Sequence, residues 1–263
     1  MNRQNLKPVT FDRYGEKSWE RPNNYNFSKG DVIAALGATE ITKTMMGTAV
    51  AFVPENENFI PVAVQGINQG QNLMVDQNGR WREVYVPAIY RSYPFRLASN
   101  EEGKHFLCVD ENSGLVKNNK NGYEPFFEDS NKLSEHTNNA FQVLVDIERD
   151  RLLSVKICEA LNYANVIEPW PLTVETKGEK KEILGLFRIS EEKLNSLEPE
   201  KFAELREGGA LLLAYCQLLS MQHIQKLGKL AWQEAEASEV QNKPSTAEFS
   251  LSNETGTLSF DNL

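Results

Sequence analysis

The sequence has few of the residues from which disulfide networks and thiol sites are built. It contains three cysteines in 263 residues, at Cys108, Cys158 and Cys216. An odd number of cysteines without a close pair does not indicate a disulfide framework. We therefore expect three reduced, buried thiols, because a free cysteine behaves as a small apolar residue.

Histidine is equally scarce, and its placement indicates no metal site. His105 and Cys108 form an H-x-x-C pattern, but on a strand two side chains three positions apart point to opposite faces. His136 stands near the expected start of a helix, where a solvated ring is the simplest interpretation. The sequence thus predicts no metal site and no cofactor.

The motifs of the common enzyme classes are absent. The chain has no G-x-S-x-G, P-loop, G-x-G-x-x-G, H-E-x-x-H or C-x-x-C pattern. Single serines, threonines and carboxylates are too common to indicate a mechanism. Whether the protein is an enzyme stays open, and we favour a role without catalysis.

Basic residues are outnumbered. The chain has 28 Lys and Arg against 37 Asp and Glu, which gives a formal net charge of −9. Binding of a phosphate backbone normally needs clustered Lys and Arg, so we expect no nucleic-acid partner. The composition does not argue against a cationic partner.

Long apolar runs are also missing. The most apolar stretch, GGALLLAYCQLLSMQHI at 208–224, is interrupted by Gln217, Ser220 and Gln222. A membrane span needs about 20 consecutive apolar residues, so we expect no transmembrane segment. The spacing puts Leu211 and Leu218 on one helical face, and a helix that is apolar around most of its girth is typical of a protein core.

The first residues, MNRQNLKPVTFDRYGEKSWERP, contain no apolar run and hence no visible secretory signal. On this basis we expect a cytoplasmic location.

The rest of the pattern predicts an α+β fold. Short runs rich in β-branched and aromatic residues fill 47–108, with turn residues between them, and Asn78-Gly79 is a strong hairpin signal. Apolar periodicity predicts two long helices, at about 134–162 and 209–231. We expect an antiparallel β-meander packed against these two helices, with a second hairpin within 172–189.

Composition divides the chain into three parts. Residues 1–30 read as an extended N-terminal arm that packs aromatic rings onto a body formed by residues 31–233. Residues 234–263 are acidic and rich in Ser, Thr and Asn, so we expect a disordered C-terminal tail. Phe249 and Leu251 alternate with serine, which leaves open that the tail pairs with a sheet edge.

Two groups of residues are candidates for ligand binding. Aromatic side chains bring a large contact area at low entropic cost, although each ring could equally serve the core. A second group combines a possible ion pair at i, i+3 with a histidine late on the expected core helix. The aromatic candidates are Trp81, Tyr85, Tyr90, Tyr93 and Trp170, and the charged or polar ones are Glu148, Arg151 and His223.

Several blocks taken in order resemble the SapC family of bacterial surface-layer accessory proteins. They are FIPVAVQGINQGQNLMVDQNGRWREVYVPAIYRSYPFRLA, FLCVDENS, ICEALNYANVIEPW and LGLFRISEEKLNSLEPEKFAELREGGALLLAYCQLLSMQHIQKL. The resemblance covers roughly residues 30–230.

The resemblance implies a role with surface layers, in the layer or in its export, and so an association with the cell surface. It transfers no catalytic residue. We expect an accessory protein that holds a peptide or protein partner. One alternative is an enzyme acting on peptides or amino acids, which requires Glu148, Arg151 and His223 to converge in one pocket. Another is a structural layer subunit, which requires ordered self-assembly. The sequence does not predict an oligomeric state.

Overall fold

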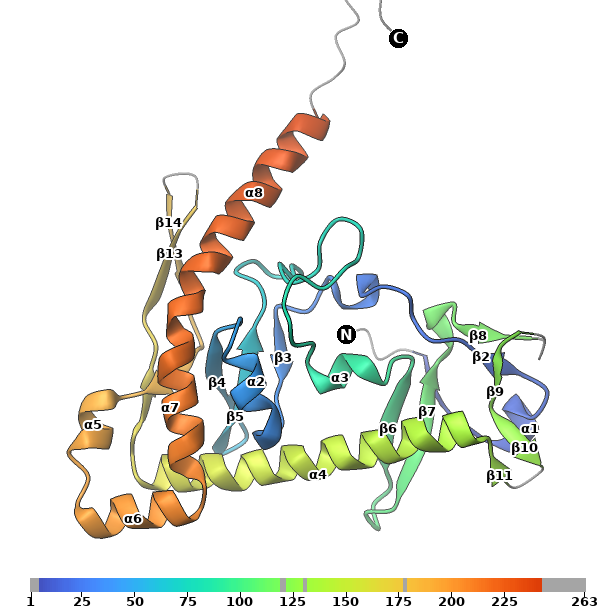
Figure 1. Ribbon diagram of the computed structural model, residues 1–263, viewed down its shortest axis with the longest axis horizontal. Helices are drawn as coiled ribbons and strands as arrows, with labels where there is room; N and C mark the ends of the chain where they lie inside the picture. The colour runs from blue at the N-terminus through green and yellow to red at the C-terminus, as the bar shows by residue number, and fades with distance from the viewer. Residues whose placement is uncertain (1–4, 119–121, 130–131, 177–178, 243–263) are drawn as a thin grey trace, which may run out of the picture.

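The computed structural model describes residues 5–118, 122–129, 132–176 and 179–242. Helices and antiparallel strand pairs make up the fold, which confirms the predicted α+β class. Figure 1 shows the strands gathered in two regions, both lying along the long helix α4 (Glu135–Tyr163).

The larger sheet has five strands and lies at the centre of the protein. Its order is β12-β15-β4-β5-β3. Along β4, Val50 and Phe52 face one core while Ala51 faces another, as the two-residue period of a strand requires. Both faces of this sheet are therefore buried. The strands are β3 (Ile33–Ala35), β4 (Val50–Glu55), β5 (Asn58–Val64), β12 (Ile167–Pro169) and β15 (Phe187–Ile189).

The strands within 48–108 do not form one meander, contrary to the prediction. The hairpin of β4 and β5 belongs to the larger sheet, whereas β6 (Phe95–Ser99) and β7 (His105–Asp110) pair with β1 (Leu6–Pro8) in a second sheet. The segment between the hairpins is mostly loop and contains the short helix α3 (Ala88–Arg91). The turn predicted at Asn78-Gly79 is present, and Gly79 has a φ of 78° beside the single bridge Val75↔Trp81.

The N-terminal arm pairs with strands of the body and contributes to its core. Its strand β2 (Ser18–Trp19) lies between β8 (Val116–Lys117) and β9 (Glu124–Pro125) in a third sheet. Tyr14 and Trp19 are buried in an aromatic core with Phe95 and Phe126. The remaining elements of this region are α1 (Phe11–Tyr14), β10 (Phe127–Asp129) and β11 (Lys132–Leu133).

Helix α4 matches the prediction closely. The Ser134 side chain caps it by accepting a hydrogen bond from the Thr137 backbone N–H at 3.3 Å. Its C-terminal half buries Ile157, Cys158 and Leu161 against the larger sheet. Its N-terminal half packs against the aromatic core of the arm, so one helix joins the two regions.

The apolar stretch forms a helix that packs on the core, as predicted. This helix is α7 (Ala210–Ser220), which follows α5 (Glu191–Asn195) and α6 (Pro199–Glu207). The single helix expected at 209–231 is divided, however: a 3-10 turn at Met221–His223 separates α7 from α8 (Ile224–Asn242). Leu213 and Ala214 are buried, whereas Leu212 and Tyr215 are exposed. None of the helices in the described part of the chain combines the length and apolar character that crossing a bilayer requires.

Gln217, the first polar interruption of that stretch, is fully buried on α7. Its Oε1 accepts a hydrogen bond from the Ile189 backbone N–H at 2.9 Å. Its Nε2 donates to the Val50 carbonyl at 3.1 Å. Strands β15 and β4 are registered at one residue pair, Phe187↔Phe52, so the glutamine amide continues their hydrogen bonding where the strands diverge.

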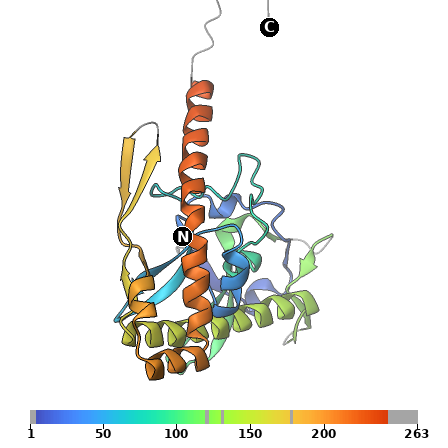
Figure 2. The ribbon, with the colours of Figure 1, turned by 60° about the vertical axis from the view of Figure 1, so that its left-hand side comes forward.

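The end of the chain differs from the prediction. Helix α8 (Ile224–Asn242) continues beyond residue 233, so the first part of the expected tail is helical. Residues 243–263, with the alternating pattern at Phe249 and Leu251, lie outside the described residues. Helix α8 packs along the hairpin of β13 (Leu172–Thr176) and β14 (Glu179–Ile183) (Figure 2).

All three cysteines are free and buried, as predicted. Burial raises the pKa of the Cys158 thiol to about 12, which keeps it protonated and unreactive at neutral pH.

We expect Gln217→Leu to lower the free energy of unfolding by about 2–4 kcal/mol, because it leaves a buried N–H and a buried C=O without partners. The measurement is urea denaturation followed by circular dichroism. The control is Gln222→Leu on the same helical segment, where the amide is exposed and bonds to the Leu219 carbonyl. Equal stability of the two variants would contradict the role assigned to Gln217.

Candidate binding pocket

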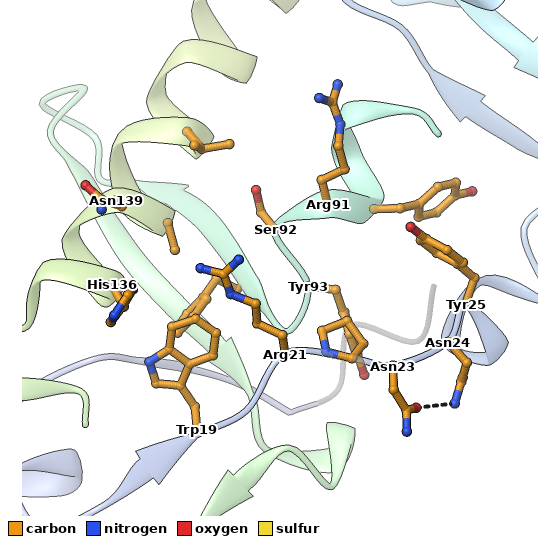
Figure 3. A pocket seen from close by; sticks show the side chains of 15 residues that line it. Trp19, Arg21, Asn23, Asn24, Tyr25, Arg91, Ser92, Tyr93, His136 and Asn139 are labelled. Carbon is orange, nitrogen blue, oxygen red and sulfur yellow. Dashed lines mark hydrogen bonds between the residues drawn. The ribbon is translucent and has the colours of Figure 1, made fainter. Parts of the chain in front are cut away.

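A pocket of about 360 Å³ lies where the arm, the α3–β6 junction and the start of α4 meet. Figure 3 shows side chains from these three parts of the chain around it. Five of its lining residues are aromatic, and amide and guanidinium groups are among the others. The lining residues are Trp19, Arg21, Pro22, Asn23, Asn24, Tyr25, Tyr90, Arg91, Ser92, Tyr93, Phe95, His136, Asn139, Ala140 and Val143.

The arm side of the pocket is fixed by hydrogen bonds to α4. Trp19 Nε1 donates to Thr137 Oγ1 at 2.9 Å, and the Trp19 ring meets Phe95 edge to face with centroids 4.7 Å apart. Ser134 Oγ donates to the Pro125 carbonyl on β9. The pocket wall is therefore preformed by the same contacts that hold the arm against the body.

Aromatic rings from the arm and from residues 81–93 form one cluster, which includes three residues of the pocket lining. Tyr93 stacks on Phe27 with ring centroids 4.0 Å apart and an interplanar angle of 7°. Trp81 touches Tyr25 and Tyr90, each with centroids 5.6 Å apart. Tyr25 and Phe27 of the arm thus join a cluster whose other members were predicted as candidate binding residues.

A buried carboxylate holds this cluster in place. Glu40 Oε1 accepts from the Ala88 backbone N–H at 2.6 Å and from the Tyr85 hydroxyl at 2.9 Å. Its Oε2 accepts from the Gly37 N–H at 2.9 Å. Burial and the nearby Glu40 charge raise the pKa of the Tyr85 phenol, which keeps that hydroxyl a donor. Glu40 therefore ties the loop that carries α3 to the turn that follows β3.

The pocket carries positive charge at its edge. In Figure 3 the Arg21 guanidinium projects from the arm between Trp19 and Ser92, on the side of His136. Arg91 instead donates to the Tyr85 hydroxyl at 2.7 Å and lies 3.8 Å from Glu40. The lining contains no Asp or Glu among the residues that the structure describes.

A second cavity of about 980 Å³ lies beyond Tyr93, which lines both spaces. Its polar residues include Asp31, Arg96 and Asp110. Burial lowers the pKa of Arg96 and raises that of Asp31. The Tyr93 hydroxyl donates to Asp110 Oδ2 at 3.3 Å, so the ring between the two cavities is anchored on the polar side.

The structure brings together half of the predicted aromatic and charged candidates. Tyr90 and Tyr93 line the pocket, and Trp81 and Tyr85 stand behind it, with Trp81 Nε1 donating to the Tyr85 carbonyl. Trp170 lies elsewhere, buried in the core between the larger sheet and α8.

The charged candidates do not converge. Arg151 pairs with Glu148 through two contacts of 2.9 Å, as the i, i+3 spacing predicted, and reaches Glu55 at 3.4 Å. His223 Nε2 instead contacts the Met45 carbonyl at 3.0 Å. No hydrogen bond or ion pair in the described part of the chain joins His223 to Glu148 or Arg151.

A family model named SapC matches residues 10–227. The chain belongs to the SapC family. No curated protein matches, and no solved structure matches.

The SapC match begins earlier than the resemblance read from the sequence. From residue 10 it takes in the arm and thus every lining residue of the pocket, and it ends within α8. Sequence reasoning missed Arg21, Tyr25 and His136 as pocket residues. The aromatic residues of the arm indicated that it packs against something, but the sequence pattern did not show which part of the chain it packs against.

We expect Glu40→Gln to destabilise the protein by about 2–4 kcal/mol, because one amide N–H₂ would face a backbone donor in a buried site. Thermal unfolding measures this loss. The control is Glu57→Gln, which makes the same chemical change at an exposed turn. A similar effect of both changes would contradict the role of Glu40.

Burial, with the charge of Asp110 adding to it, raises the pKa of Tyr93 to about 12. This folded-state pKa lies above the unfolded value near 10. The protonated Tyr93 hydroxyl, bonded to Asp110, therefore contributes stability below about pH 10, and this contribution is lost as the pH rises toward 12. We expect Asp110→Asn to lower the pKa of Tyr93.

The measurement is an alkaline titration of tyrosine absorbance, in which Tyr93→Phe identifies the signal by removing it. If the midpoint of the Tyr93 titration is unchanged in Asp110→Asn, the carboxylate does not act on the phenol.

Proposed function

We propose that this SapC-family protein is a non-catalytic accessory protein that holds a short segment of a partner protein in the pocket formed by the arm, α3–β6 and α4. The partner belongs to the cell envelope or surface layer, as the family resemblance implies. Membership of the family is shown, and the binding role rests on the pocket.

One observation carries this proposal: the pocket is an open, aromatic-walled cavity with fixed walls. Trp19 and Tyr93 are each held by a ring contact and a hydrogen bond of their own. Rigid aromatic walls lose little entropy when a ligand arrives, which is why such residues dominate the binding energy of protein interfaces.

The volume of the pocket sets the size of the ligand. About 360 Å³ is near the lower end of the range of small-molecule pockets, roughly 300–1,000 Å³. It accommodates one or two side chains of an extended segment and no folded unit. The partner would therefore insert a short peptide.

The enzyme alternative gains no support from the site that it required. Arg151 is paired with Glu148 and Glu55 rather than with His223. His223 contacts a backbone carbonyl on another part of the chain.

The test is selection of random displayed peptides on the immobilised full-length protein. We expect the selected peptides to bind the protein and to lose at least about tenfold in affinity in Asn139→Trp, because an indole would occupy the pocket that the aromatic walls offer to the ligand.

The matched control is Asn138→Trp, which places the same ring on the neighbouring exposed position of α4, outside the pocket lining. Peptides that bind both variants equally would place the binding surface elsewhere, and the absence of any selected peptide would contradict the proposal.

A further inference from the structure

We infer that the pocket recognises a peptide segment in which an aromatic residue stands directly beside an aspartate or glutamate. This ligand class rests on the proposed function. Three features of the described residues carry it: an exposed arginine without an ion pair, a buried hydroxyl without a hydrogen-bond partner, and a lining with aromatic rings and no carboxylate.

Arg21 supplies the cation. It is exposed at the pocket edge and makes no ion pair with any residue that the structure describes. The other guanidinium of the lining, Arg91, lies 3.8 Å from Glu40, and the His136 ring Nε2 lies 3.4 Å from Glu124. A guanidinium that is free to present two parallel N–H groups matches a carboxylate.

Ser92 supplies a second donor. The residue is 6% exposed, and its Oγ has no hydrogen-bond partner among the described residues. A buried hydroxyl without a partner costs stability, and native proteins rarely leave one so. Figure 3 shows the Arg21 guanidinium on the side of His136 and the Ser92 hydroxyl directed away from it. A ligand oxygen in the pocket could accept from Ser92, and a ligand carboxylate could pair with Arg21.

The walls favour a ring beside that carboxylate. Trp19, Tyr25 and Tyr93 line the pocket, and aromatic rings gain from edge-to-face and offset contacts with another ring beyond the area that they bury. The limited volume places the ring and the acid on adjacent residues of the ligand rather than far apart.

The charge of the lining discriminates between acidic and basic segments. It contains Arg21 and Arg91 and, within the described part of the chain, no Asp or Glu. This composition contrasts with the net charge of −9 for the whole chain. A lysine or arginine beside the aromatic residue would meet like charge and find no acceptor carboxylate in the lining.

The experiment measures fluorescence anisotropy of end-capped, labelled peptides titrated with the full-length protein at physiological ionic strength. The probes are GSDFDSG, its amide analogue GSNFNSG, its basic analogue GSKFKSG and its ring-deleted analogue GSDADSG. We expect GSDFDSG to bind at least about tenfold more tightly than each of the other three, because loss of a charge-assisted contact or of an aromatic anchor has that effect.

Two variants test the residues. We expect Arg21→Gln to weaken GSDFDSG about tenfold and Ser92→Ala to weaken it about threefold or more, in line with charged and neutral hydrogen bonds. Arg149→Gln, an exposed arginine of α4 paired with Asp146 and outside the lining, should leave binding unchanged. Circular dichroism of each variant confirms that it is folded.

Three outcomes would overturn the inference: equal binding of the four peptides, binding that neither Arg21→Gln nor Ser92→Ala weakens, or displacement of GSDFDSG by a short oligothymidylate. If GSDFDSG fails to bind while displayed peptides bind and are blocked by Asn139→Trp, this ligand class is wrong and the proposed function stands. If displayed peptides also fail, the proposed function itself is contradicted.

Discussion

The position of α7 over the larger sheet depends on one buried side chain, Gln217, whose amide bonds to the backbone of two strands. Strand β15 meets β4 at a single registered pair, and the Gln217 amide then bonds to a backbone group on each strand. The neighbouring Ser220 Oγ accepts from the Val50 N–H at 2.9 Å. Because these groups are buried, leaving them unpaired would cost more than the bonds themselves contribute. Helix α7 is thereby fixed in position and direction over the larger sheet.

Helix α4 connects the larger sheet to the pocket. Its C-terminal half buries Ile157 and Leu161 in the core shared with α7, and its first turns contribute His136 and Asn139 to the pocket. A helix of 29 residues is about 44 Å long at 1.5 Å per residue, which is long enough to contact both regions. Tyr90 is a second link, because it lines the pocket and also packs in the core of the larger sheet, where its hydroxyl donates to Gln65 Oε1 at 2.8 Å. The arm closes the pocket through the hydrogen bond from Trp19 Nε1 to Thr137 Oγ1 on that helix.

Local patterns predicted those elements whose stability is decided by nearby residues. The apolar period of α4 and α7, the alternation of β4 to β7 and the turn at Gly79 were all readable from the sequence. The assignment of strands to sheets was not, because β7 pairs with β1 through partners as distant as Leu6 and Asp110, and no local pattern encodes that pairing. The end of α8 was misjudged because its acidic residues suggested a tail, although Ala, Gln and Glu are good helix formers. In the pocket, the rings at 90 and 93 were predicted, but Arg21 acquires its position only through the pairing of the arm with β8 and β9.

A cationic pocket in an acidic protein has consequences for how a ligand is recognised. At physiological ionic strength the Debye length is about 8 Å, so the scattered carboxylates of the surface barely affect a peptide already seated beside Arg21. At low ionic strength the net charge of −9 repels an approaching acidic segment from afar, while the contact with the guanidinium grows stronger. The two effects oppose each other, because long-range charge governs the encounter and short-range pairing governs how long the complex lasts. Recognition of an acidic segment by this pocket would therefore depend on contact with Arg21 rather than on attraction over distance.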